Sequence, residues 1–393
     1  MTTGSTGAAS QSHDSSAPEG SGRRVDWIEL FFDLAIVAFV TELASGLHGD
    51  PGPVQFITFL AWSIPAWWAW INVMVCINAL PTLPPRMAGA ALLVAMAAVG
   101  LMAASVTETA ERVWAFALAN GVLRLVLLVL WVYRAKRARH PMLRTFIYNG
   151  VTAVLWIASA FLPSPANFAV WAAAILIEVL MLRAGTRSLS RYVKVDVAHG
   201  SERLGLFMII LLGESVLSVV TALSAHWSAS SAFAALLGFA AIALIAWGFF
   251  VAGGNVIEEG LARLDRRGNV AALLDTVMLI PYLIVASITM FSAGLATAID
   301  HPTAHLAPGA AICLGGGLAL FYLTDAVVMG RYGSPTARIL PWAIPAVLLP
   351  TAVIALGSVV TATVALLTTT AIVAAVSVVS GINKRRVGQS AVQ

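Results

Sequence analysis

Residues 25–40 read VDWIELFFDLAIVAFV, and they decide the fold. The stretch is as apolar as a membrane span, yet it carries Asp26, Glu29 and Asp33. A charged side chain near the centre of a bilayer costs about 2.5–3.5 kcal/mol by insertion scales, and such groups usually mark a pathway or a site. Glu29 and Asp33 are four residues apart, so they share one face of a helix. The stretch therefore indicates a membrane helix that presents acids to other helices.

The composition of the chain points the same way. Its 393 residues are 59% hydrophobic and 11% charged, whereas a soluble domain carries about 25% charged residues. We therefore expect an all-α polytopic membrane protein. Its two cysteines, Cys76 and Cys313, lie in apolar runs. They predict small buried thiols, with no disulfide framework and no metal site.

Twelve apolar runs approach the length of about 20 residues that a span needs. They are 27–47, 54–79, 87–107, 111–134, 144–162, 166–183, 203–223, 231–254, 271–298, 308–328, 339–357 and 361–381. Of the 23 Lys and Arg residues, all but Arg112 and Arg124 then fall on one side of the membrane. This is the pattern of a chain with about twelve transmembrane helices and both termini in the cytoplasm. The charge therefore reflects topology and gives no reason to expect a nucleic-acid partner.

The order of the runs also suggests an internal repeat. We expect a disordered cytoplasmic tail at 1–24, a first six-helix half at 25–184, and a basic cytoplasmic linker at 185–202. A second six-helix half at 203–381 and a cytoplasmic tail at 382–393 complete the chain. Acids open the first helix of each half, and similar Trp-containing motifs, AWWAWIN and AWGFF, recur in the second helix of each half. Two parallel repeats of this kind are found in transporters.

Most intramembrane ionisable groups fall in the cytoplasmic half of their runs. We expect a polar vestibule there, open to the cytoplasm and narrowing toward Arg124 and Glu214. Helical periodicity puts His199, Arg203 and Glu214 on one stripe. A buried charge needs a partner, so we expect Arg203 to pair with Asp33 or Glu29, and Arg124 to pair with Glu214. The candidate pathway or site residues are Glu29, Asp33, Arg124, His199, Glu202, Arg203 and Glu214.

Two stretches resemble the signatures of a known family. The first is WIELFFDLAIVAFVTELA at 27–44, and the second is HGSERLGLFMIILLGESVLSVV at 199–220. Together with WWAWINV at 67–73 and ANGVLRLVLLVL at 119–130, they resemble the bacterial low temperature requirement protein A (LtrA) family. The resemblance implies a multi-pass protein of the bacterial cytoplasmic (inner) membrane. It implies no particular chemistry, because the family name comes from a growth phenotype.

The family pattern covers every candidate residue given above, but the later half of the chain departs from it. Family members tend to have a tyrosine and a histidine before the proline of the ninth helix, where this chain has Val277 and Leu279. The WWLYFD motif of the eighth helix is replaced by AWGFFVA, which loses the acid. Roles that depend on those groups do not carry over to this chain.

A fainter likeness concerns the lysosomal-type potassium channels, which are built from two six-helix repeats. The spacing Glu29-x-Phe31-x-Asp33 and the pair Arg203 and Phe207 are similar to motifs of that family. Trp27 stands where its motif has an arginine, and Phe32 stands where it has a serine. The likeness agrees with the repeat that the order of the runs predicts.

Three functions fit these features. In the first, which we favour, the acids line a conduit or carrier for an ion or small solute. In the second, the protein is a membrane-embedded enzyme that acts on a hydrophobic isoprenoid or lipid substrate, with Glu214 or Asp33 as the general acid or base. In the third, the charges only hold helices together. Besides the lipid bilayer and the solute, ion or hydrophobic substrate, the sequence is compatible with a homo-oligomer; it leaves any cofactor unknown and predicts no metal site.

Overall fold

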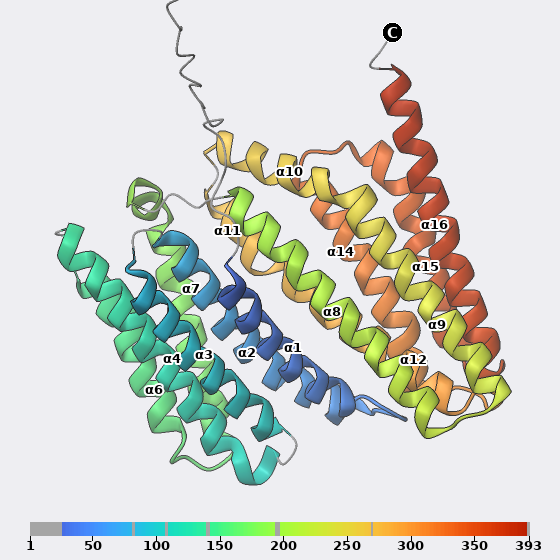
Figure 1. Ribbon diagram of the computed structural model, residues 1–393, viewed down its shortest axis with the longest axis horizontal. Coiled ribbons are helices and arrows are strands. Elements are labelled where there is room, and N and C mark those ends of the chain that lie inside the picture. Colours follow the sequence, from blue (N-terminus) through green and yellow to red (C-terminus); the bar gives the residue numbers. More distant parts are fainter. Residues whose placement is uncertain are drawn as a thin grey trace, which may run out of the picture.

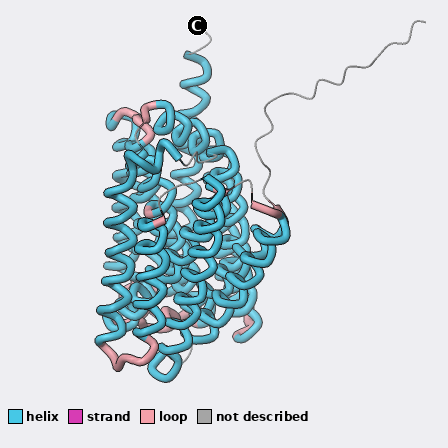
Figure 2. Tube along the Cα trace, turned by 90° about the vertical axis from the view of Figure 1, so that its left-hand side faces the viewer, coloured by secondary structure: helices cyan, strands magenta, loops and turns pink. Residues whose placement is uncertain are grey.

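The computed structural model describes residues 26–80, 83–106, 109–138, 142–192, 197–268 and 270–390. In these ranges every extended regular element is a helix, and the single β-bridge joins His305 to Thr361. The tail expected at 1–24 lies outside the described residues. The tube in Figure 2 shows a bundle of roughly parallel helices with the loops gathered at its two ends.

The first part of the chain forms helices up to Tyr192. They are α1 (Trp27–Ser45), α2 (Pro53–Ala79), α3 (Pro85–Val106), α4 (Thr109–Ala138), α5 (Leu143–Thr145), the π-helical η1 (Phe146–Val151), α6 (Thr152–Ser159) and α7 (Ala166–Tyr192). The second part begins with α8 (Val197–Ala225), α9 (Ala229–Trp247), the π-helical η2 (Gly248–Gly253), α10 (Gly254–Arg266) and α11 (Val270–Met278). It continues with α12 (Ile280–Asp300), α13 (Pro308–Ala311), the π-helical η3 (Ile312–Gly316), α14 (Gly317–Arg331), α15 (Thr336–Leu356) and α16 (Ala362–Ser390).

Ten helical stretches in the described ranges are long and apolar enough to cross a membrane. This confirms an all-α membrane protein. Two of the twelve expected runs are not among the ten. Helix α1 carries Glu29, Asp33 and Glu42 within 19 residues, and the continuous helix α5–η1–α6 spans only Leu143–Ser159. The count of twelve therefore stays a prediction.

Several boundaries differ from the expected runs. The run at 271–298 forms one span, Ala272–Asp300, with a one-residue interruption at Leu279 between α11 and α12, two positions before Pro281, which has no backbone N–H to donate. The last expected run ends at 381, whereas α16 continues to Ser390. Much of the expected linker at 185–202 belongs to the end of α7 and the start of α8, and residues 193–196 lie outside the described residues.

Helix α10 differs from its neighbours because it lies across one end of the bundle (Figure 1). Its Leu261 and Leu264 side chains are buried, whereas Glu258 and Glu259 are exposed. This division of apolar and polar faces is typical of a helix that rests at a water–protein boundary. The run expected at 231–254 therefore ends in η2, and the chain then turns into α10.

The helices form two groups with a shared boundary. Figure 1 shows α1–α7 (blue to green) on one side and α9, α14, α15 and α16 (yellow to red) on the other, with α8 between them. At the boundary, α1 contacts both α8 and α12, and α2 also contacts α12. We call α1–α7 the first half and α8–α16 the second half.

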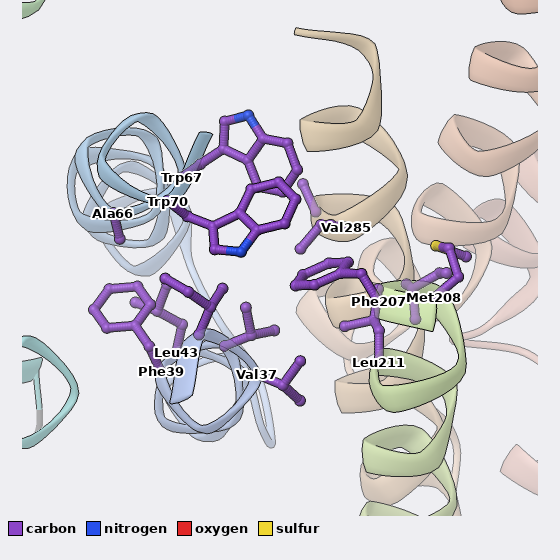
Figure 3. Packing of buried hydrophobic residues seen from close by; sticks show 14 of the residues in the cluster. Val37, Phe39, Leu43, Ala66, Trp67, Trp70, Phe207, Met208, Leu211 and Val285 are labelled. Atoms are coloured by element: carbon purple, nitrogen blue, oxygen red, sulfur yellow. The ribbon is translucent and has the colours of Figure 1, made fainter. Parts of the chain in front are cut away.

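Aromatic rings fill much of this boundary. Trp67 and Trp70 of α2 face Phe207 of α8, with Val285 of α12 beside them (Figure 3). The ring centroids of Trp67 and Trp70 are 4.6 Å apart, and those of Trp70 and Phe207 are 4.8 Å apart. All four side chains are buried. The two halves therefore meet through a tightly packed apolar layer.

Candidate functional site

A charged cluster joins the first helix of each half. Arg203 of α8 donates two hydrogen bonds to the Asp33 carboxylate of α1, from Nε to Oδ2 at 3.1 Å and from Nη2 to Oδ1 at 2.9 Å. Its Nη1 lies 3.5 Å from Glu29 Oε2. His199 Nε2 lies 3.1 Å from the same Glu29 oxygen. We call Glu29, Asp33, His199 and Arg203 the α1–α8 cluster. The expected pairing of Arg203 with Asp33 and Glu29 is confirmed.

The cluster is buried, and aromatic rings flank its arginine. Each of its four side chains is at most 2% exposed. The Arg203 guanidinium carbon lies 5.9 Å from the Phe32 ring centroid and 6.0 Å from that of Trp70. Rings at this distance stabilise a desolvated cation. The bidentate geometry and the rings together offset part of the cost of burying these charges.

A second buried charged cluster lies within the first half. Arg124 of α4 donates from Nε and Nη2 to the Glu178 carboxylate of α7, at 3.1 and 3.2 Å. Its Nη1 donates to Asn120 Oδ1 at 3.0 Å, and its guanidinium carbon lies 5.4 Å from the Trp156 ring centroid. Arg124 and Glu178 are both buried. We call Asn120, Arg124 and Glu178 the α4–α7 cluster.

Helix α2 connects the two clusters. Trp70 Nε1 donates to Asp33 Oδ1 at 2.8 Å, and Trp68 Nε1 donates to Glu178 Oε2. Trp67 Nε1 donates to the Met278 carbonyl at 2.7 Å, at the break between α11 and α12. Residues on a helix are turned by about 100° per position, so Trp67, Trp68 and Trp70 reach three different neighbours. Periodicity alone did not predict these hydrogen bonds; the sequence signal for them is a set of indole donors spaced around one helix.

The expected pairing of Arg124 with Glu214 is wrong, because Arg124 is bonded to Glu178. The error comes from the assumed end of the sixth run at residue 183. That end placed Glu178 close to the membrane surface instead of at the depth of Arg124. Helix α7 in fact continues to Tyr192. Arg124 and Glu178 each lie 14 residues before the end of their helix, at Ala138 and Tyr192. They therefore lie at matching depth.

Glu214 and Glu202 lie apart from both clusters. Glu214 is half-buried on α8. Glu202 is exposed and lines a cavity in the second half. Of the seven candidate residues, the structure thus brings four together in the α1–α8 cluster and places the other three at separate positions.

The expected open vestibule is not found around the clustered charges. Glu29, Asp33, Arg203 and Arg124 are each at most 1% exposed. Beside the aromatic layer, a cavity of about 20 Å³ lies between α1, α2 and α12, which is room for about one water. Around these four side chains the charges are satisfied by one another instead of lining water.

No cluster of three or more His, Cys, Asp or Glu side chains with the arrangement of a metal site occurs in the described ranges. Cys76 and Cys313 are both buried free thiols. The charged groups of both clusters are engaged in hydrogen bonds with each other and with indoles. Their chemistry is that of ion pairing in a low-dielectric interior.

Comparison with known proteins gives one result. The family model described as bacterial low temperature requirement A protein (LtrA) matches residues 24–378. No curated protein and no solved structure matches the chain. The match covers both halves, both charged clusters and the α2 tryptophans. The chain therefore belongs to the LtrA family.

Proposed function

We propose that this LtrA-family protein is a conduit or carrier for an ion or small solute. In the proposal it has twelve spans, with 25–184 and 203–381 as two parallel six-helix halves. The linker 185–202 and both termini lie in the cytoplasm of a bacterial cell, and the protein resides in the cytoplasmic membrane. The observation that carries the proposal is the α1–α8 cluster, because it places buried ionisable groups at the boundary between the halves.

Helix packing supports the two repeats. In the first half α1 packs on α3, α3 on α4, α4 on α6, and α6 on α7. In the second half α8 packs on α12, α12 on α14, α14 on α15, and α15 on α16. Numbered as spans, both series read first on third, third on fourth, fourth on fifth and fifth on sixth. The second span contacts the sixth in each half as well, as α2 with α7 and α9 with α16.

The basic residues support the orientation. Asp275 of α11 contacts Arg183 in the C-terminal part of α7 at 2.7 Å and Arg331 at the end of α14 at 3.8 Å. These helix ends therefore share one end of the bundle. Arg263 of α10 donates to the Tyr332 carbonyl, just after α14, so α10 belongs to the same end. This is the end where positive charge accumulates, as expected for the cytoplasmic side.

The aromatic layer supports a closed state. Trp67, Trp70 and Phe207 fill the boundary next to the α1–α8 cluster (Figure 3). Passage of a solute needs these rings to separate, and separation of the halves must strain the bonds between Arg203 and the acids of α1. Protonation of His199 adds a positive charge 3.1 Å from Glu29 Oε2, which changes the balance of that contact. We infer that proton or ion binding at this cluster is coupled to opening.

The enzyme alternative has less support. Asp33 accepts three hydrogen bonds, from Arg203 and Trp70, and is fully buried. It has no access to a substrate in this state. Neither Asp33 nor Glu214 lines the larger cavity of the second half. A general acid or base must reach the proton that it transfers, so the conduit or carrier is the better account of these groups.

Flux into proteoliposomes tests the proposal. The parent protein is compared with Asp33→Asn and Glu214→Gln for uptake of protons, K⁺ and Na⁺, after each variant is checked for a monodisperse folded state. Glu178→Gln is the matched control, because it neutralises a buried acid that pairs with an arginine inside one half. We expect the parent to move at least one of the ions, Asp33→Asn to lose this flux, and Glu178→Gln to retain it.

The opposite results would reject the proposal. A parent protein that passes none of the three ions rules out the ion conduit. Equal flux in the parent, Asp33→Asn and Glu214→Gln removes both carboxylates from the pathway. If Asp33→Asn fails to fold while no folded variant has a flux defect, the α1–α8 cluster acts only as a structural link between helices.

A further inference from the structure

A cavity in the second half lies outside both charged clusters. It has a volume of about 330 Å³ and is enclosed by α8, η2, α10, α11, α12 and α14. This volume lies at the lower end of the range of about 300–1,000 Å³ that is typical of small-molecule sites. Phe207 and Val285 belong to its wall and also to the apolar layer between the halves (Figure 3). The cavity and the α1–α8 cluster therefore lie on different faces of α8, since His199 and Arg203 belong to the cluster and Ser201, Gly205 and Met208 line the cavity.

The lining is apolar inside and polar at one end. The apolar part includes Met208 of α8, Phe249 and Phe250 of η2, and Ile284 of α12. The polar side chains are Ser201, Glu202, Glu258, Thr276 and Tyr332. They come from the first turns of α8, from α10, from α11 and from the end of α14, which is the basic end of the bundle. A ligand of this cavity would need a polar group on an apolar body.

The polar end of the cavity carries negative charge, although it lies at the basic end of the bundle. Glu202 and Glu258 line the cavity, and the described lining contains no Lys or Arg. The arginines nearby have other partners. Arg331 donates to Thr276 Oγ1 at 3.0 Å and pairs with Asp275, and Arg263 donates to the Tyr332 carbonyl. Arg203 is turned toward α1. Neither Glu202 nor Glu258 has an ion pair with a described residue, and both side chains are exposed.

The aromatic lining also favours a positively charged ligand. Phe207, Phe249, Phe250 and Tyr332 present rings to the cavity, and the centroids of Phe249 and Phe250 are 5.1 Å apart. Ring faces attract cations, most strongly where water is excluded. We propose that the cavity binds a hydrophobic organic cation, with its charge near Glu202 and Glu258 and its apolar body against Met208, Phe249 and Phe250. This goes beyond the proposed transport function and does not depend on it.

Binding of tetraphenylphosphonium tests the inference. The full chain is placed in nanodiscs of phosphatidylglycerol, and saturable binding of radiolabelled tetraphenylphosphonium is measured against empty nanodiscs. Tetraphenylborate has nearly the same shape and the opposite charge. We expect saturable binding of the phosphonium at one site per chain and no saturable binding of the borate. Equal binding of both ions would overturn the inference, because it would show an apolar pocket without charge selection.

Two kinds of variant locate the site. Glu202→Gln and Glu258→Gln each remove one carboxylate, and each is expected to weaken phosphonium binding about tenfold. Glu259→Gln is the matched control, because Glu259 pairs with Arg263 and does not line the cavity; its affinity should equal that of the parent. Parent-like affinity in the Glu202→Gln/Glu258→Gln double variant would overturn the proposal.

Gly205→Leu tests the cavity itself. Gly205 lines the cavity, and a Cβ placed on it meets no atom within 4 Å. The leucine should therefore occupy cavity space without a clash and should abolish phosphonium binding while the protein stays folded. Unchanged binding in a folded Gly205→Leu protein would place the phosphonium elsewhere and reject the site. Because these measurements need no flux, they are independent of the outcome of the transport experiment.

The lipid composition identifies the source of the natural cation. Phosphatidylethanolamine carries an ammonium group on an apolar body, and soluble hydrophobic amines share that chemistry. Nanodiscs with and without phosphatidylethanolamine are compared at equal protein concentration. Weaker phosphonium binding in its presence indicates a lipid ammonium as occupant, and unchanged binding indicates a soluble cation. This comparison is made only after tetraphenylborate has been shown not to bind, because that result establishes that the cavity selects cations.

Discussion

The two charged clusters share a design but differ in where they lie. In each, an arginine makes a bidentate contact with a carboxylate, an α2 tryptophan donates to that carboxylate, and an aromatic ring flanks the guanidinium. The α4–α7 cluster joins helices within the first half. The α1–α8 cluster joins the halves and adds Glu29 and His199. The same chemistry thus links helices inside the first half in one place and helices of the two halves in the other, where we propose that it connects parts that move.

The largest difference is expected in transport when both charges of a pair are removed. The double variant Arg124→Gln/Glu178→Gln should fold and retain the flux of the parent, because its pair lies inside one half. The double variant Asp33→Asn/Arg203→Gln should fold and lose the flux, because its pair lies between the halves. Flux per folded protein in proteoliposomes measures this. Equal flux in the two double variants would mean that the α1–α8 cluster has no role beyond packing.

Single arginine removal should affect stability strongly in both clusters. Arg124→Gln leaves Glu178 buried without its cation, and Arg203→Gln does the same to Asp33. Breaking a buried pair in this way costs about 3–5 kcal/mol. Equilibrium unfolding in mixed micelles should show losses of this size for both, and both double variants should be more stable than the corresponding single ones. A loss below about 1 kcal/mol would indicate that water reaches the abandoned carboxylate.

Removing the indole donor of Trp68 or of Trp70 should lower the free energy of unfolding by similar amounts, and by less than removing an arginine does. Trp68→Phe removes the indole donor to Glu178, and Trp70→Phe removes the donor to Asp33. A hydrogen bond to a charged group contributes about 1.5–3 kcal/mol. The free energy of unfolding of both variants, measured in mixed micelles, should fall by about that amount. Trp70→Phe should also change the flux in proteoliposomes. Trp62→Phe is a control, because Trp62 is buried on α2 and packs edge-on against Phe116 without an indole bond to either cluster.

The sequence predicted the α1–α8 contact because its evidence is local. Glu29 and Asp33 share a face of one short helix, His199 and Arg203 share a face of another, and both helices begin at the same end of the bundle. The partner of Arg124 could not be found in this way. Its identification needed the true end of α7 and the packing of α4 on the rest of the first half, and neither follows from hydropathy.

The α2 hydrogen bonds and the cavity of the second half could not be predicted from the sequence for the same reason. The tryptophans of WWAWINV are buried, and the acceptor of each indole depends on which helix lies beside each face. The cavity of the second half is likewise a product of packing among α8, α10, α12 and α14, and no spacing within one helix predicts it. Sequence periodicity thus predicts the faces of helices, whereas tertiary packing decides what each face meets.

The smallest expected effect lies at the edge of the α4–α7 cluster. Tyr148 Oη donates to Asn72 Oδ1 at 2.6 Å, and Asn72 Nδ2 donates to the Trp68 carbonyl at 2.7 Å. Tyr148→Phe removes one neutral hydrogen bond, which contributes about 0.5–1.5 kcal/mol. Unfolding in mixed micelles should register this small loss, and the flux should stay unchanged at every pH. A change in the pH dependence of flux would contradict the assignment, because it would give the first half a part in proton coupling that we ascribe to His199.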